Sequence, residues 1–102
     1  MSHPIPEDAQ RLADRLRMAA DEIESAARYG VPIPSVVSVS GSIYGGMSFA
    51  ATEDEFVAWA EYAEVDVERD HHHGHDWSSA EADFNGLPVR FSHRHDNPEV
   101  TA

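Results

Sequence analysis

The sequence predicts an α+β fold, in which two helices pack on one face of a small antiparallel sheet in the order α-β-β-α-β-β-β. Two observations carry this prediction. A turn dipeptide, Asn85-Gly86, separates two alternating apolar runs, and two other stretches repeat apolar residues at helical spacing between capping residues. The 102-residue chain has no cysteine and is expected to form one domain over 1–102 without disulfides, with 1–5 and 97–102 as loose tails.

A long amphipathic helix is predicted from Glu7 to Tyr29. Pro6 suits its start, and Gly30 suits the left-handed position after its last turn. The charged residues are expected to lie on a solvated face. The inward face consists of apolar residues at helical spacing: Leu12, Leu16, Ala19, Ile23 and Ala26 or Ala27.

Two short strands are predicted at 35–40 and 47–51, because apolar and polar residues alternate in both. The glycine-rich segment 41–46 between them has the composition of a phosphate-binding loop. Such a loop requires a helix after it, whereas a strand follows here, so the segment is predicted to be a hairpin tip. Ile43 and Tyr44 are then exposed on this tip and are candidate partner contacts.

A second helix is predicted at 53–64, because Thr52 and Glu55 have the spacing of a capping box. Its inward residues are expected to be Phe56, Trp59, Ala60 and Ala63, and its outward residues Asp54, Glu61 and Tyr62. A further strand is predicted around Val65 and Val67, followed by a histidine-rich loop at 71–75.

The last two strands are predicted to form a hairpin around Asn85 and Gly86. This register gives one apolar face, made by the opposed pairs Phe84 and Leu87, Ala82 and Val89, and Ala80 and Phe91. The other face opposes Glu81 and Arg90 as an ion pair. We expect the apolar face to share one core with Phe56 and Trp59.

The charge is concentrated in one segment. The chain carries a formal charge of −12, and residues 53–70 contain eight acidic residues and one arginine. Such a surface repels nucleic acid and anionic membranes and attracts basic partners. The candidate partner-binding acids are Asp54, Glu61, Glu64, Asp66 and Glu68.

Six of the seven histidines lie between 71 and 95. The hairpin register places His93 and His95 on one face beside Asp76, and His73, His75 and Asp96 are expected on the other. Imidazole and carboxylate groups are ligands for zinc, nickel and copper, so these are candidate metal ligands. The spacing matches no metal motif, and histidines at a strand end often only form hydrogen bonds, so no metal site is expected.

A hydrolytic triad of Ser78, His95 and Asp76 is conceivable, but strand pairing alone brings such side chains together. The Gly41–Gly45 segment is not a nucleophile elbow. We therefore expect no catalytic residue, no cofactor and no enzymatic activity.

The middle of the chain resembles small actinobacterial and actinophage α+β proteins of unknown function. Two stretches carry the resemblance, PIPSVVSVSGSIYGGMSFAATEDEFVAWAEYAEVDVE and GLPVRFSH, which cover most of residues 31–95. Those proteins share a strand pair, a capped helix with an EFxAWA-like stretch and a terminal G-x-P-V strand. The lysine-free, arginine-rich composition suits such high-GC genomes. The resemblance implies a phage or mobile-element origin, and it assigns no activity and no residue roles.

These observations favour a small acidic accessory factor that binds another protein. The expected partner is a basic host protein. Two alternatives are a DNA mimic, which needs carboxylates in a regular double row, and a histidine-based metal-binding protein. Direct binding to nucleic acid or membrane is not expected, and a homodimer through a sheet edge is a further option. The N-terminal segment lacks the pattern of a signal peptide, so the expected location is the cytoplasm.

Overall fold

The computed structural model describes residues 3–95 and has the predicted order of elements. They are α1 (Glu7–Arg28), β1 (Ser38–Val39), β2 (Met47–Ala50), α2 (Glu53–Ala63), β3 (Glu68–His72), β4 (His75–Phe84) and β5 (Leu87–Arg94). The α+β fold class is confirmed. Neither helix in this part of the chain has the length and apolarity needed to cross a membrane. The tail predicted at 97–102 lies outside the described residues.

The sheet is mixed, so the prediction of a wholly antiparallel sheet is wrong. Its order is β1-β2-β5-β4-β3, and β2 pairs with β5 in parallel. The reason is that β5, with its buried Leu87, Val89 and Phe91, takes the central position between β2 and β4. Parallel pairing needs a long connection, which α2, β3 and β4 supply between β2 and β5.

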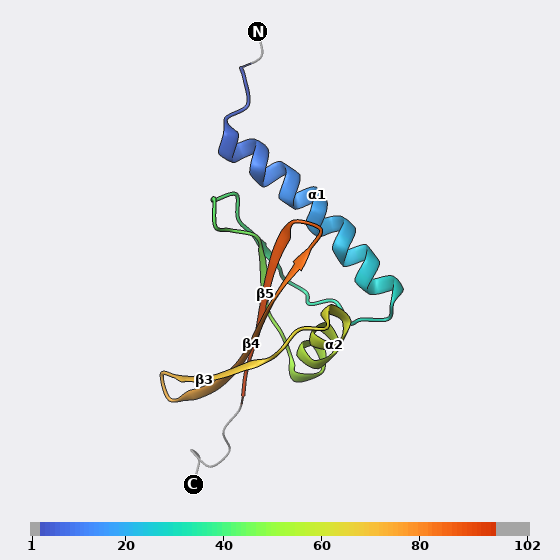
Figure 1. The fold of residues 1–102 in the computed structure, drawn as a ribbon, viewed down its shortest axis with the longest axis vertical. Coiled ribbons are helices and arrows are strands. Elements are labelled where there is room, and N and C mark those ends of the chain that lie inside the picture. Colours follow the sequence, from blue (N-terminus) through green and yellow to red (C-terminus); the bar gives the residue numbers. More distant parts are fainter. Residues whose placement is uncertain (1–2, 96–102) are drawn as a thin grey trace.

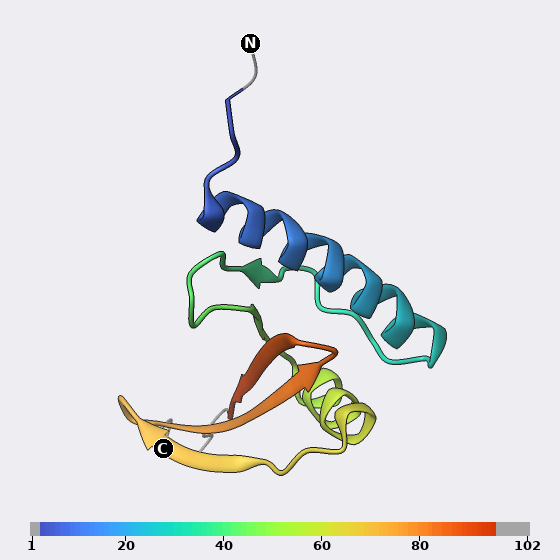
Figure 2. The ribbon, with the colours of Figure 1, turned by 45° about the horizontal axis from the view of Figure 1, so that its top comes forward.

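Both helices pack on the apolar face of the sheet, as predicted (Figures 1 and 2). The largest fully buried side chains are Trp59, Phe91, Met47, Leu87 and Val89. Phe56 and Phe84 belong to the same cluster, which confirms the core expected from the hairpin register. The Trp59 indole N–H donates to the Pro32 carbonyl oxygen at 3.0 Å, so the buried ring leaves no unpaired donor.

The hairpin of β4 and β5 has the predicted register, with Phe84 opposite Leu87 and Glu81 opposite Arg90. Asn85 and Gly86 have φ values of 55° and 95°, as their turn requires. The Arg90 guanidinium lies 2.6 Å from the Glu81 carboxylate. Local turn chemistry therefore determines this part of the fold.

Replacing Gly86 with valine is expected to lower the free energy of unfolding by about 1–3 kcal/mol, because a branched side chain resists positive φ. Lost packing is not the cause, since a Cβ at Gly86 would have Met18 Cε, at 3.8 Å, as its nearest neighbour. Urea denaturation measures the effect. The matched change Asn85→Gly should be close to neutral, and equal costs for the two changes would contradict this account.

Two helix faces differ from the prediction. Leu16 was expected inward but is 50% exposed. Tyr62 was expected outward but packs against the core, where its hydroxyl donates to Glu22 at 2.8 Å and lies 3.0 Å from Ser25 Oγ. Burial raises the pKa of Tyr62, and the Glu22 carboxylate raises it further. Tyr62 thus makes a partly buried polar contact between the two helices, where a solvated side chain was expected.

Strand boundaries also differ. The first strand is only Ser38–Val39, and the residues around Val65 and Val67 form a connector before β3. The predicted histidine loop is instead the end of β3 and a two-residue turn, in which His73 and Gly74 have φ values of 52° and 78°. Histidine tolerates this left-handed conformation better than most residues, so His73-Gly74 closes a tight hairpin.

Candidate functional site

A groove of about 700 Å³ lies between α2 and the strands β3–β5. We call it the α2 groove. Its lining residues are Glu53, Phe56, Val57, Ala60, Glu61, Glu64, Val65, Val67, Arg69, Ser78, His93 and His95. Val57 and Val67 are 49% and 43% exposed, so large apolar side chains face solvent here. The α2 groove combines an apolar floor with three carboxylates and a single guanidinium.

Two of the five predicted partner-binding acids line this groove. Glu61 and Glu64 line it directly, whereas Asp54 is exposed in the first turn of α2. Glu64, Asp66 and Glu68 line a second cavity of about 600 Å³ with Arg90. Glu64 ends α2 with φ 55°, which places it between the two cavities. The acidic segment is therefore divided between two cavities, and Glu64 lines both.

The polar end of the groove is formed by three hydrogen-bonded side chains. Ser78 Oγ and His95 Nε2 lie 2.6 Å apart, and Ser78 is buried. His93 Nδ1 donates to the Ala51 carbonyl oxygen at 2.9 Å, and the His93 and His95 rings meet edge to face at 4.9 Å. These bonds fix both imidazoles against the sheet.

His71 and His72 of β3 are hydrogen-bonded to exposed carboxylates. His71 Nδ1 lies 2.7 Å from Asp76 Oδ1, and His72 Nε2 lies 2.8 Å from Asp70 Oδ2. The His71 backbone N–H also donates to Asp70 Oδ1 at 2.9 Å. This backbone donor, with a smaller contribution from His72, holds the pKa of Asp70 below its usual range.

The candidate metal ligands are dispersed. Asp76 bonds to His71 across the strand pair, and His93 and His95 bond to Ala51 and Ser78. His73 lies in the turn and His75 begins β4, while Asp96 lies outside the described residues. Within residues 3–95 no three His, Asp or Glu side chains are arranged to hold a metal ion.

The conceivable triad is brought together only in part. Ser78 and His95 are hydrogen-bonded, but the Asp76 carboxylate is directed to His71. A carboxylate that orients the imidazole is the element that a serine triad requires, and here it serves a different histidine.

The glycine-rich hairpin tip is held by two arginines of α1. Arg11 donates to the Gly41 carbonyl oxygen at 3.0 Å. Arg15 donates to the carbonyl oxygens of Ser40 at 2.8 Å, Ser42, and Ile43 at 3.5 Å. The tip presents Ile43 at 71% and Tyr44 at 98% exposure, as predicted. It is thus a fixed element with two exposed apolar side chains.

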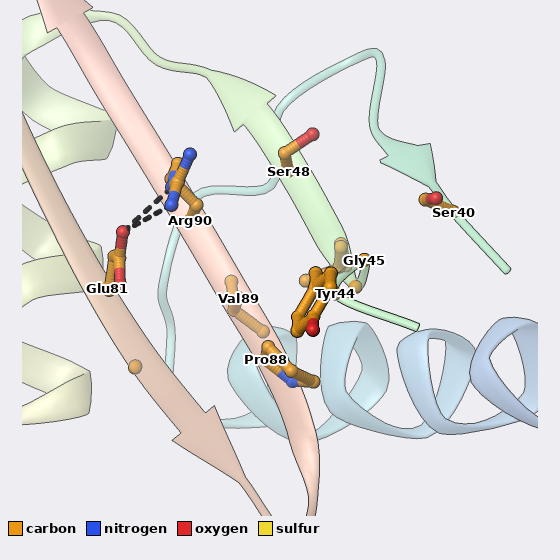
Figure 3. A pocket seen from close by; sticks show the side chains of 11 residues that line it. Ser40, Tyr44, Gly45, Ser48, Glu81, Pro88, Val89 and Arg90 are labelled. Atoms are coloured by element: carbon orange, nitrogen blue, oxygen red, sulfur yellow. Dashed lines mark hydrogen bonds and ion pairs between the residues drawn. The ribbon is translucent and has the colours of Figure 1, made fainter. Parts of the chain in front are cut away.

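A smaller cavity of about 290 Å³ lies beneath this tip on the helix-free face of the sheet (Figure 3). In Figure 3 the Tyr44 ring lies close to Pro88, and the Glu81–Arg90 ion pair lies farther along the strands. The tip belongs to the β1–β2 side of the sheet and the α2 groove to the β3 side. One small ligand therefore does not contact both.

The sequence analysis missed the arginine contacts and the buried Glu22. A signal was present, because Arg11, Arg15, Met18 and Glu22 recur at helical spacing along the stripe that also holds Ala19 and Ala26. Arginines in line with a buried stripe favour contact with another segment over a solvated face.

Comparisons with protein-family models, with curated proteins and with solved structures found no match to this chain.

Proposed function

We propose that this protein is a small acidic accessory factor, without enzymatic activity, that binds a basic segment of a partner protein in the α2 groove. The observation that supports the proposal is the pairing of exposed Val57 and Val67 with the carboxylates of Glu61 and Glu64 around one groove. The acids concentrated at 53–70 favour a basic partner, and a phage or mobile-element origin would make that partner a host protein.

The two components of the groove have different roles in binding. The apolar floor supplies the area that a partner side chain removes from water, which gives most of the affinity. The carboxylates attract a basic partner over a distance of about a Debye length and raise its association rate. Together they favour a segment in which apolar and basic residues are neighbours.

A DNA mimic is the weaker alternative for this geometry. Asp66, Glu68 and Asp70 follow one another at every second residue and supply one row of acids, and Asp70 is engaged with His71 and His72. Imitation of DNA needs two regular rows of charge. The apolar floor of the α2 groove would also have no role in imitating DNA.

The test is the double reversal Glu61→Lys, Glu64→Lys. A partner is first captured with the wild-type protein from an actinobacterial lysate, identified by mass spectrometry and purified. The reversed protein is then expected to associate with it about tenfold more slowly, and the wild-type rate is expected to fall steeply with salt. Surface plasmon resonance measures both quantities.

The matched control is Asp21→Lys, Glu24→Lys, which makes the same change of charge on exposed residues of α1. It should retain most of the wild-type association rate. A purified partner that binds both reversed proteins at the same rate would contradict a role for the α2 groove.

A further inference from the structure

The strand β3 lies at one edge of the sheet beside the α2 groove. Within residues 3–95 it pairs only with β4, in the order β1-β2-β5-β4-β3, and all five of its residues, Glu68–His72, are exposed. Figure 1 shows the β3–β4 hairpin projecting beyond both helices. Such an edge offers unpaired backbone groups to another extended chain.

The register identifies those backbone groups. The tight turn at His73-Gly74 is closed by the pair His72 and His75. In an antiparallel ladder, pairs that exchange hydrogen bonds alternate with pairs whose backbone groups point outward. The N–H and C=O groups of Arg69 and His71 therefore point away from β4. The Asp70 carboxylate already accepts from the His71 N–H, which shields one of the two outward donors.

The two faces beside this edge differ in chemistry. Val67 and Arg69 line the α2 groove with the exposed Val57. On the opposite face, Asp66 and Glu68 line the second cavity, of about 600 Å³. Side chains alternate between the two faces along a strand. Every second side chain of an added strand would therefore contact the apolar groove, and the side chains between them would contact the carboxylates.

We propose that β3 accepts an extended basic segment of the partner as a sixth strand, with apolar side chains toward Val57 and Val67 and lysine or arginine side chains toward Asp66 and Glu68. This inference rests on the proposed function and specifies the form in which the partner segment binds. A second copy of this chain is a poor occupant, because it brings the same carboxylates to the edge of a protein with a charge of −12.

The probe is a short, end-blocked peptide of alternating lysine and valine, added to the ¹⁵N-labelled full-length protein. We expect its binding to shift the amide signals of Arg69 and His71. Two further peptides are N-methylated, one on every lysine and the other on every valine. Because only one set of peptide N–H groups faces β3, one of them should bind about tenfold or more weakly, and the other should retain most of the affinity.

A pair of variants at Arg69 separates strand addition from simple charge attraction. Arg69→Pro removes the outward N–H without removing a bond to β4, and Arg69→Gln removes the same charge but keeps the N–H. If charge attraction alone caused binding, both variants would bind the basic peptide at least as tightly as the wild type. Strand addition predicts that Arg69→Pro binds about tenfold more weakly than Arg69→Gln.

The possible outcomes distinguish failure of strand addition from failure of the proposed function. If neither methylation nor Arg69→Pro weakens binding, while Glu61→Lys, Glu64→Lys does, strand addition is wrong and the proposed function stands. If Glu61→Lys, Glu64→Lys has no effect while methylation abolishes binding, strand addition stands and these two carboxylates of the groove do not contribute to binding. If the wild-type protein is a dimer and Arg69→Pro dissociates it, a second copy of the chain occupies the β3 edge and the inference is wrong. If Arg69→Pro does not fold, the two methylated peptides still decide the question.

Discussion

Replacing Phe91 with alanine is expected to lower the free energy of unfolding by about 3–5 kcal/mol, the range for deleting a fully buried phenylalanine. The Phe91 side chain is 0% exposed. Its ring stacks on Phe49 with centroids 5.5 Å apart and meets Phe56 edge to face at 5.3 Å. The change would therefore leave a cavity between the sheet and α2 that the surrounding rings are too rigid to fill.

Urea denaturation followed by tryptophan fluorescence measures the loss. Phe91→Leu keeps most of the volume and should cost less than about 1.5 kcal/mol. Phe84→Ala is a second control, because Phe84 is only partly buried at the rim of the same core, and it should cost less than Phe91→Ala. Equal losses at positions 84 and 91 would contradict the placement of Phe91 at the centre.

Local chemistry predicted the elements that depend on neighbouring residues. The capping box is formed, with Thr52 Oγ1 accepting from the Glu55 N–H and the Glu55 carboxylate accepting from the Thr52 N–H. The Asn85-Gly86 turn then determined the register of β4 and β5, and with it the buried face of the hairpin. Each of these features is decided within a few residues, so a single sequence is sufficient.

The parallel pairing of β2 with β5 could not be predicted in the same way. Apolar alternation shows which face of each strand is buried, but it does not show which strands are neighbours. Met47 pairs with Val89 and Phe49 with Phe91, across about forty residues of chain. An antiparallel neighbour would have buried the same side chains, so the sequence pattern does not distinguish the two.

The acids of the candidate site were identified, but their setting was not. Composition located Glu61, Glu64, Asp66 and Glu68, whereas the groove beside them exists only because α2 packs across the end of the sheet. A strand was predicted around Val65 and Val67, but its extension through His72 and the tight His73-Gly74 turn were not. His-Gly is not among the dipeptides that mark a two-residue hairpin turn.

Replacing Gly46 with alanine tests the parallel pairing directly. A Cβ at this position would lie 2.1 Å from the Pro88 carbonyl oxygen, so β2 and β5 would have to move apart. The expected loss in free energy of unfolding is about 3 kcal/mol, the upper end for an overpacked site, because the contact is with backbone and no side chain can rotate away.

The matched control is Gly30→Ala, where a Cβ meets no atom within 4 Å but the residue has φ +82°. Its cost should be only the conformational one, about 1 kcal/mol. Hydrogen exchange should also show faster exchange of the β2 amides in Gly46→Ala and unchanged exchange there in Gly30→Ala, since only the first change separates β2 from β5. If the two alanine variants are equally stable, β2 does not approach Pro88 as closely as the parallel register requires, and the central position of β5 would have to be revised.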